Sequence, residues 1–152
     1  MLAEVFKAVI FRVGDEEYGL HIDHVLSIER MQPVTTVPKM PEYVKGVIHL
    51  RGIVTPIIEL RKALLQSDVE ENDDTRIIAV KVDGQPIGLV VDEATDVIDI
   101  PLDSIQKLNY GHYDVSFLLG VAKLNDRLLV LIDINNLLRN ITSIDEWKNA
   151  MS

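Results

Sequence analysis

Residues 44–61 read VKGVIHLRGIVTPIIELR, and this stretch decides the fold class. Two runs rich in Val and Ile flank a Leu-Arg-Gly turn, and branching at Cβ suits these residues to a pleated strand. Gly52 supplies the permissive backbone that a tight reversal needs, so we predict a structural role for it in the turn. Pro56 lacks an N–H donor, which predicts an edge or a bulge in the second strand. The stretch therefore predicts a β-hairpin.

The chain contains a second copy of this pattern. Two stretches align without a gap with later ones: residues 46–64 with 120–138, and residues 13–23 with 82–92. Both recur in the same order at nearly the same offset, which predicts two repeats of about 70 residues, roughly 8–66 and 75–140. Units of this size bury little apolar surface alone. We therefore expect them to share a core within one domain, 1–152.

Short strands dominate both repeats, so the predicted fold class is mainly β, with two fused small barrels or sandwiches and short helices. Asp23, Asp92 and Asp133 are predicted as helix N-caps, and Trp147 as a packing anchor on a short C-terminal helix. The expected elements are hairpins at 8–22 and 76–91, an extended connector at 32–41, an acidic loop at 66–75, an extended segment at 92–104 closed by a turn, a loop at 109–114, and helices at 24–30, 61–65, 134–139 and about 143–150.

Composition excludes several classes of protein. Apolar residues make up 47% of the chain, which excludes a disordered polypeptide. Lys and Arg total 15 against 24 acidic residues, and the formal charge of -9 makes nucleic acid and anionic membranes poor partners. The start of the chain lacks a signal-peptide pattern, and no apolar run is long enough to span a membrane, so we expect a cytoplasmic protein. Without cysteine there is no disulfide or thiolate chemistry.

Few residues suggest enzyme chemistry. His21 and His24 with Asp23 form a weak metal-site candidate, because neighbours at a strand-to-helix boundary point in different directions. Asp92, Glu93 and Asp96 could serve a small β-barrel hydrolase, but paired carboxylates matter only where a pocket shifts their pKa values. The common nucleophile, zinc, nucleotide and redox motifs are absent from the sequence. We expect no cofactor and no metal.

Three other residues leave a choice open. Arg51 occupies the hairpin turn, while the second copy has Asn125 at that position; it is either a solvated turn residue or a binding group. Val25 and Ile28 share one face of the predicted helix at 24–30, which is either buried or an apolar docking patch.

Several linked motifs resemble the CheW-like family, the bacterial chemotaxis coupling proteins. VKGVIHLRGIVTPIIELRK resembles the family signature, with His49 where members usually carry Asn. YGLHIDHVLSIER resembles the first hairpin and helix, IGLVVDEATDVIDI the middle segment, and FLLGVAKLNDRLLVLIDINNLL the closing hairpin and helix. The resemblance spans about residues 5–140.

The resemblance implies two five-stranded SH3-like β-barrels on a shared hydrophobic core, and no catalysis. It implies an adaptor that couples the histidine kinase CheA, through the regulatory domain of the kinase, to the cytoplasmic tips of chemoreceptors. Arg51 corresponds to the signature arginine on the receptor-facing surface, and Val91 to a wall of the receptor groove. Val25 and Ile28 fall in the segment used against the kinase. Such a protein is expected to be monomeric alone and part of receptor arrays.

Alternatives to the plain adaptor come from three classes. A receiver-linked coupling protein shares this domain, but the chain ends at Ser152, which favours the adaptor. A hydrolase would need a deep polar cleft bearing Asp92, Glu93 and Asp96. An oligonucleotide-binding barrel conflicts with the acidic charge and the aromatic content of 5%.

Overall fold

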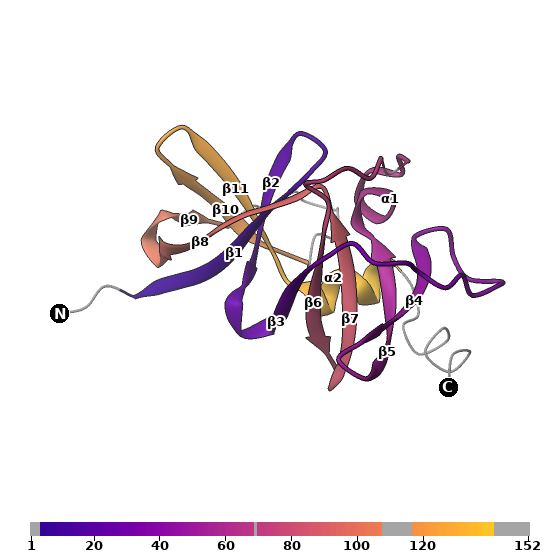
Figure 1. The fold of residues 1–152 in the computed structure, drawn as a ribbon. Helices are drawn as coiled ribbons and strands as arrows, with labels where there is room; N and C mark the ends of the chain where they lie inside the picture. Colours follow the sequence, from indigo (N-terminus) through magenta and orange to yellow (C-terminus); the bar gives the residue numbers. More distant parts are fainter. Residues whose placement is uncertain (1–3, 69, 108–116, 142–152) are drawn as a thin grey trace.

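The computed structural model describes residues 4–68, 70–107 and 117–141 as two β-sheets with short helices (Figure 1). The six-stranded sheet has the order β8-β1-β2-β11-β10-β9, and the five-stranded sheet the order β3-β6-β7-β5-β4. The strands of the first sheet are β8 (Glu93–Pro101), β1 (Val5–Val13), β2 (Glu16–His21), β11 (Arg127–Ile132), β10 (Leu118–Leu124) and β9 (Ile105–Gln106). Those of the second are β3 (Val25–Arg30), β6 (Arg76–Val82), β7 (Gln85–Val91), β5 (Ile53–Glu59) and β4 (Val44–Leu50).

The predicted fold class is confirmed, because the protein is mainly β with two sheets and few short helices. One sheet has the five expected strands, and the other gains the two-residue strand β9. The helical segments are η1 (Ile22–His24), α1 (Leu60–Leu65), η2 (Leu102–Ser104) and α2 (Ile134–Ile141).

The two sequence repeats exchange strands, which the sequence did not reveal. The opening hairpin β1–β2 joins the closing hairpin β10–β11 of the second repeat through a parallel β2–β11 pairing. The hairpin β6–β7 likewise joins β4–β5 of the first repeat through a parallel β5–β7 pairing. The third strand of each repeat also crosses over, since β3 pairs with β6 and β8 pairs with β1. Each sheet is therefore built from both repeats.

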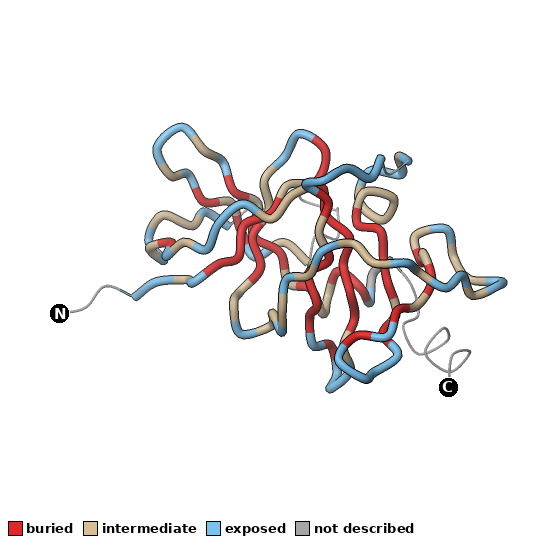
Figure 2. The backbone as a smooth tube through the Cα atoms, viewed as in Figure 1, coloured by how far each residue is buried: buried red, intermediate tan, exposed pale blue. Residues whose placement is uncertain are grey.

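The described residues form three apolar clusters, one within each sheet and one between the sheets. Figure 2 shows the buried parts of the backbone running along the strands of both sheets. Strand β1 shows how alternation serves two of them: Ala8 and Ile10 face the cluster inside the six-stranded sheet, while Val9 and Phe11 face the cluster between the sheets. Because both faces are buried, the strand reads as a nearly continuous apolar run. Leu89, in β7 of the other sheet, meets Val9 and Phe11 in the cluster between the sheets.

The central hairpin, β4–β5, is confirmed. Its turn residues Arg51 and Gly52 have φ angles of 52° and 83°, and positive φ at both central residues is typical of a two-residue hairpin turn. Pro56 lies in an interior strand and not at an edge, since β5 has β4 on one side and β7 on the other. The parallel pairing with β7 begins only at Ile57, so the missing N–H of Pro56 costs no ladder hydrogen bond there. A bulge lies nearby in β4, between Val44 and Gly46.

The predicted helix at 24–30 is wrong. The single turn η1 is followed directly by β3, which pairs with β6 along its length. Asp23 is not the N-cap: its own N–H donates to Nδ1 of His21, which takes that role. Apolar residues three apart suit a helix face, but they also suit a bulged strand, and tertiary pairing selects the strand.

The other described helices agree with prediction. The helix at 61–65 is observed as α1, and α2 begins after Asp133, whose Oδ1 accepts from the N–H of Asn136 at 3.3 Å. The predicted loop at 109–114 and the helix at 143–150 with Trp147 lie outside the described residues.

Candidate functional site

Strand β3 is an edge strand and carries the residues predicted to bind a kinase. Val25 lies opposite Val80 of β6, and Ile28 lies opposite Ile78. Both partners belong to the cluster between the sheets. Directly opposite residues project from the same face of a sheet, so Val25 and Ile28 share a face although they are three apart. The register shift between Val25 and Ser27 makes this possible.

The two residues differ in exposure. Val25 is half-buried against the core between the sheets, whereas Ile28 is 43% exposed. Leu26, the extra residue of the bulge, is 53% exposed beside them. Sequence reasoning missed Leu26, because on the predicted helix it would have left the face shared by its neighbours. We call Val25, Leu26 and Ile28 the β3 patch.

Arg51 stands at the tip of the β4–β5 hairpin with its side chain 72% exposed. Its Nη2 lies 3.4 Å from Oε1 of Glu29, on the edge strand β3. An exposed pair of this kind contributes little to stability, so the guanidinium remains available to a partner. Ile53 and Val54 follow the turn and are 52% and 62% exposed. The tip thus presents a cation beside apolar surface.

The structure does not place Val91 on a surface. Its side chain is 1% exposed and lies in the cluster between the two sheets. The prediction that Val91 forms a wall contacted by a receptor therefore needs correction. The run IGLVV at the end of β7 is buried on both faces, because the strand lies inside its sheet and both faces pack on apolar clusters.

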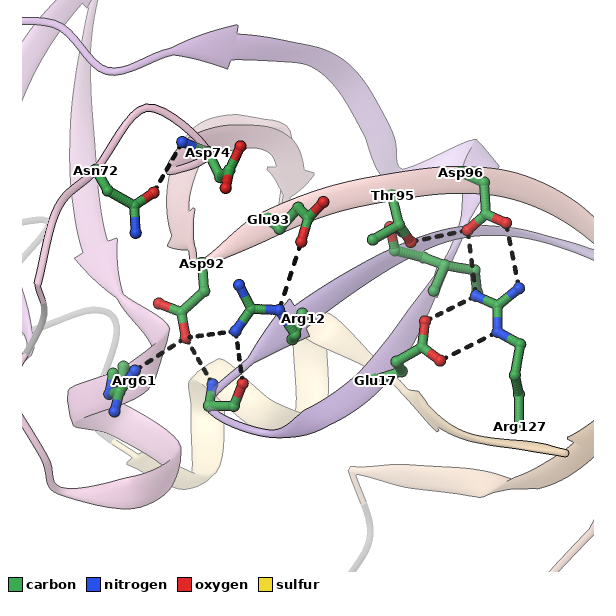
Figure 3. A network of polar contacts seen from close by, with 12 residues as sticks. Arg12, Glu17, Arg61, Asn72, Asp74, Asp92, Glu93, Thr95, Asp96 and Arg127 are labelled. Atoms are coloured by element: carbon green, nitrogen blue, oxygen red, sulfur yellow. Dashed lines mark hydrogen bonds and ion pairs between the residues drawn. The ribbon is translucent and has the colours of Figure 1, made fainter.

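Asp92 is a buried structural anchor at the point where the chain passes from β7 in one sheet to β8 in the other (Figure 3). The residue is 7% exposed. Its Oδ2 accepts from the N–H of Gly14 at 2.6 Å and from Nη1 of Arg61 at 3.1 Å. Nη1 of Arg12 lies 3.8 Å from the same oxygen, and Arg12 Nε lies 3.5 Å from Glu93. Asp92 and Glu93, two of the three carboxylates considered for a hydrolase, are therefore paired with guanidinium groups.

Asp96 belongs to a separate ion cluster (Figure 3). Arg127 on β11 donates to Glu17 on β2 at 2.7 Å and to Asp96 on β8 at 3.3 Å. The hydrogen bond from Arg127 lowers the pKa of Asp96, aided by a hydrogen bond from Thr95. The hydrogen bonds to Glu17 and Asp96 raise the pKa of Arg127. Asp96 is thus held ionised and is unsuited to acid catalysis.

These positions give no support to a hydrolase. Asp92, Glu93 and Asp96 divide between two ion clusters instead of converging on a cleft. A pocket beside α1 is lined by other residues, namely Glu42, Tyr43, Lys62, Ala63, Gln66, Ser67 and Asp68.

The described residues also contain no group of three or more His, Cys, Asp or Glu that could hold a metal ion. The ring centroids of His21 and His24 are 6.3 Å apart, and the two ring planes are inclined at 77° to each other in an edge-on contact. Within residues 4–68, 70–107 and 117–141, no helix has the length and apolar character needed to cross a bilayer.

Fold and site together define a double-sheet β domain that exposes apolar side chains on the edge strand β3 and both apolar side chains and a cation at the tip of the β4–β5 hairpin. A family model described as "CheW-like domain" matches residues 7–142. The chain belongs to the CheW-like family.

Individual relatives agree with this assignment. "Chemotaxis protein CheW" of Bacillus subtilis is 41% identical over 135 residues, covering 87% of this chain and 86% of the relative. The protein of the same description from Helicobacter pylori is 35% identical over 139 residues, covering 90% and 83%. The crystal structure of the scaffolding protein TtCheW from Thermoanaerobacter tengcongensis matches with a TM-score of 0.79 and 34% identity, covering 90% of this chain and 89% of that one.

Proposed function

We propose that this protein is a non-enzymatic chemotaxis adaptor that couples the histidine kinase CheA to the cytoplasmic tips of chemoreceptors. Support comes from the family match over residues 7–142 and from relatives described as chemotaxis proteins. In this proposal the protein is cytoplasmic, monomeric alone, and recruited to receptor arrays at the membrane. It uses no cofactor.

The observation that carries the proposal is the β3 patch. An apolar group at an edge strand is poorly covered by its own fold, and Ile28 and Leu26 are 43% and 53% exposed there. The regulatory domain of CheA is the proposed partner at this patch. Its apolar surface would bury Ile28 and Leu26, while Val25 supports them from the core side.

The proposed receptor-facing group is Arg51. A guanidinium offers a planar fork of donors to carboxylates and carbonyls of a receptor helix. The turn of the second hairpin has Asn125 at this place with a φ of 54°, close to the 52° of Arg51. The turn geometry therefore does not require arginine, which favours a binding role. Val91 enters the proposal only as a core residue beneath the surface.

Binding of purified CheA regulatory domain tests the kinase side. We expect the wild type to bind, and Ile28→Asp to weaken binding by at least about tenfold, since a charge at a desolvated anchor loses its contacts. Leu65→Asp is the matched control, because Leu65 in α1 is also 43% exposed but lies away from β3. Equal binding by Ile28→Asp and wild type, with both proteins folded by thermal melting, would show that the patch is misplaced.

A further inference from the structure

His21 ends β2 and acts as the N-cap of η1, a role that histidine rarely fills. Its Nδ1 accepts a hydrogen bond from the backbone N–H of Asp23 at 3.1 Å. The same Nδ1 lies 3.5 Å from Oδ2 of Asp23. One ring nitrogen therefore faces both a donor and an acceptor that belong to a single residue.

Only neutral imidazole can make the observed cap. A protonated ring carries hydrogen on both nitrogens and cannot accept from the Asp23 N–H. It can instead donate to the Asp23 carboxylate, which already lies beside Nδ1. Protonation thus exchanges a backbone cap for an ion pair without moving the ring far.

The position of this cap gives the exchange a consequence. Residues Ile22–His24 form the crossing from β2 in one sheet to β3 in the other, and the N–H of Val25 bonds to the carbonyl of Ile22. Val25 begins the β3 patch. Loss of the cap loosens the turn that sets the start of this strand. We propose that His21 is a pH-sensitive cap that controls the order of η1 and the first residues of β3.

The surroundings of His21 contain few other charges. The Phe6 ring on β1 contacts the imidazole edge to face at 4.8 Å, and His24 on η1 lies 6.3 Å away. Of the charged residues on the strands that pack against η1, Lys7 on β1 pairs with Asp99 of β8 at 3.9 Å. Lys81 on β6 is exposed and makes no ion pair with a described residue. Among the described residues, Asp23 is therefore the carboxylate placed to form an ion pair with a protonated His21.

Asparagine at position 21 provides the matched variant, because it is a favoured N-cap acceptor that does not titrate. In an NMR titration of the full chain between about pH 5.5 and 7.5, the Asp23 amide shift of the wild type should follow protonation of the His21 ring. In His21→Asn the Asp23 amide should hold one shift throughout. His24→Gln controls for the second ring and should keep the wild-type titration. An Asp23 amide that ignores the His21 titration, or that titrates equally in His21→Asn, overturns the proposal.

A second measurement, which rests on the proposed function, follows affinity for the purified CheA regulatory domain. At each pH, the affinity of the wild type is divided by that of His21→Asn. This ratio should be about threefold lower at pH 5.5 than at pH 7.5, as expected for loss of one cap. An equal pH profile for both proteins contradicts control of β3 by His21. Absence of CheA binding by both the wild type and His21→Asn at every pH would refute the kinase proposal. The NMR titration would still decide whether His21 exchanges the backbone hydrogen bond for the ion pair with Asp23.

Discussion

Replacing Asp92 by alanine should destabilise the whole domain. The carboxylate is 7% exposed and accepts from the Gly14 N–H at 2.6 Å and from Arg61 at 3.1 Å, with Arg12 also close. Removing one partner of a buried pair costs about 3–5 kcal/mol. Because the two guanidinium groups are 34% and 35% exposed and can be rehydrated, we take the lower end, about 3 kcal/mol. For a chain of this size that lowers the melting temperature by about 6–12 °C.

Asp23 offers a matched control, since it occupies the corresponding position of the first repeat but its side chain is 83% exposed. Asp23→Ala should change stability by less than about 0.5 kcal/mol at pH 7.5. Thermal melting followed by circular dichroism measures both variants. Asp92→Ala should melt in one transition, because each sheet contains strands of both repeats. A melting temperature within about 2 °C of that of Asp23→Ala, or two separate transitions, would refute this reasoning.

Two further predictions concern the glycines of the central hairpin and the acid limb of stability. Gly46→Ala should prevent normal folding, because a Cβ there would overlap the carbonyl oxygen of Thr35. Gly52→Ala should cost only the strain of positive φ, about 1 kcal/mol, because a Cβ there would meet no atom within 4 Å outside the neighbouring residues. Urea unfolding separates them, and similar stabilities would contradict the bulge geometry. Arg127 lowers the pKa of Asp96 below its ordinary value of 3.8, so the stability it contributes is present above that pH and is lost as pH falls below it. Asp96→Asn should therefore lose less stability on acidification than the wild type. Denaturant unfolding from pH 6 to pH 3 measures this, and an identical acid dependence of the two proteins would contradict a stabilising contact between Arg127 and Asp96.

Local sequence pattern predicted the strands well but could not predict their partners. The hairpins were visible because β-branched runs flank turn residues such as Arg51 and Gly52. The repeats were visible by alignment, yet the pairing of β3 with β6 and β8 with β1 depends on contacts between distant segments. The helix predicted at 24–30 failed for the same reason, since a bulge and a helix both bring Val25 and Ile28 onto one face.

The candidate site was predictable only where exposure follows from a turn. Arg51 lies at a two-residue hairpin tip, and such a position is exposed in most folds. Val91 and Asp92 could not be judged in this way, because their burial depends on how the two sheets pack. Asp92 looked like a helix cap, but its partner Arg61 lies in another element and became visible only in the structure.

Receptor-coupled kinase activity, measured with purified CheA, receptor and this protein, tests the adaptor proposal most directly. The wild type should bring the kinase under receptor control. Arg51→Ala should fold and bind CheA normally but weaken receptor engagement by about thirtyfold, and so fail to couple at working concentrations. Arg139→Ala, which changes another exposed arginine in an ion pair, should couple like the wild type. Lack of coupling by the wild type would contradict the adaptor function, and full coupling by Arg51→Ala would contradict the receptor-facing role of the hairpin tip.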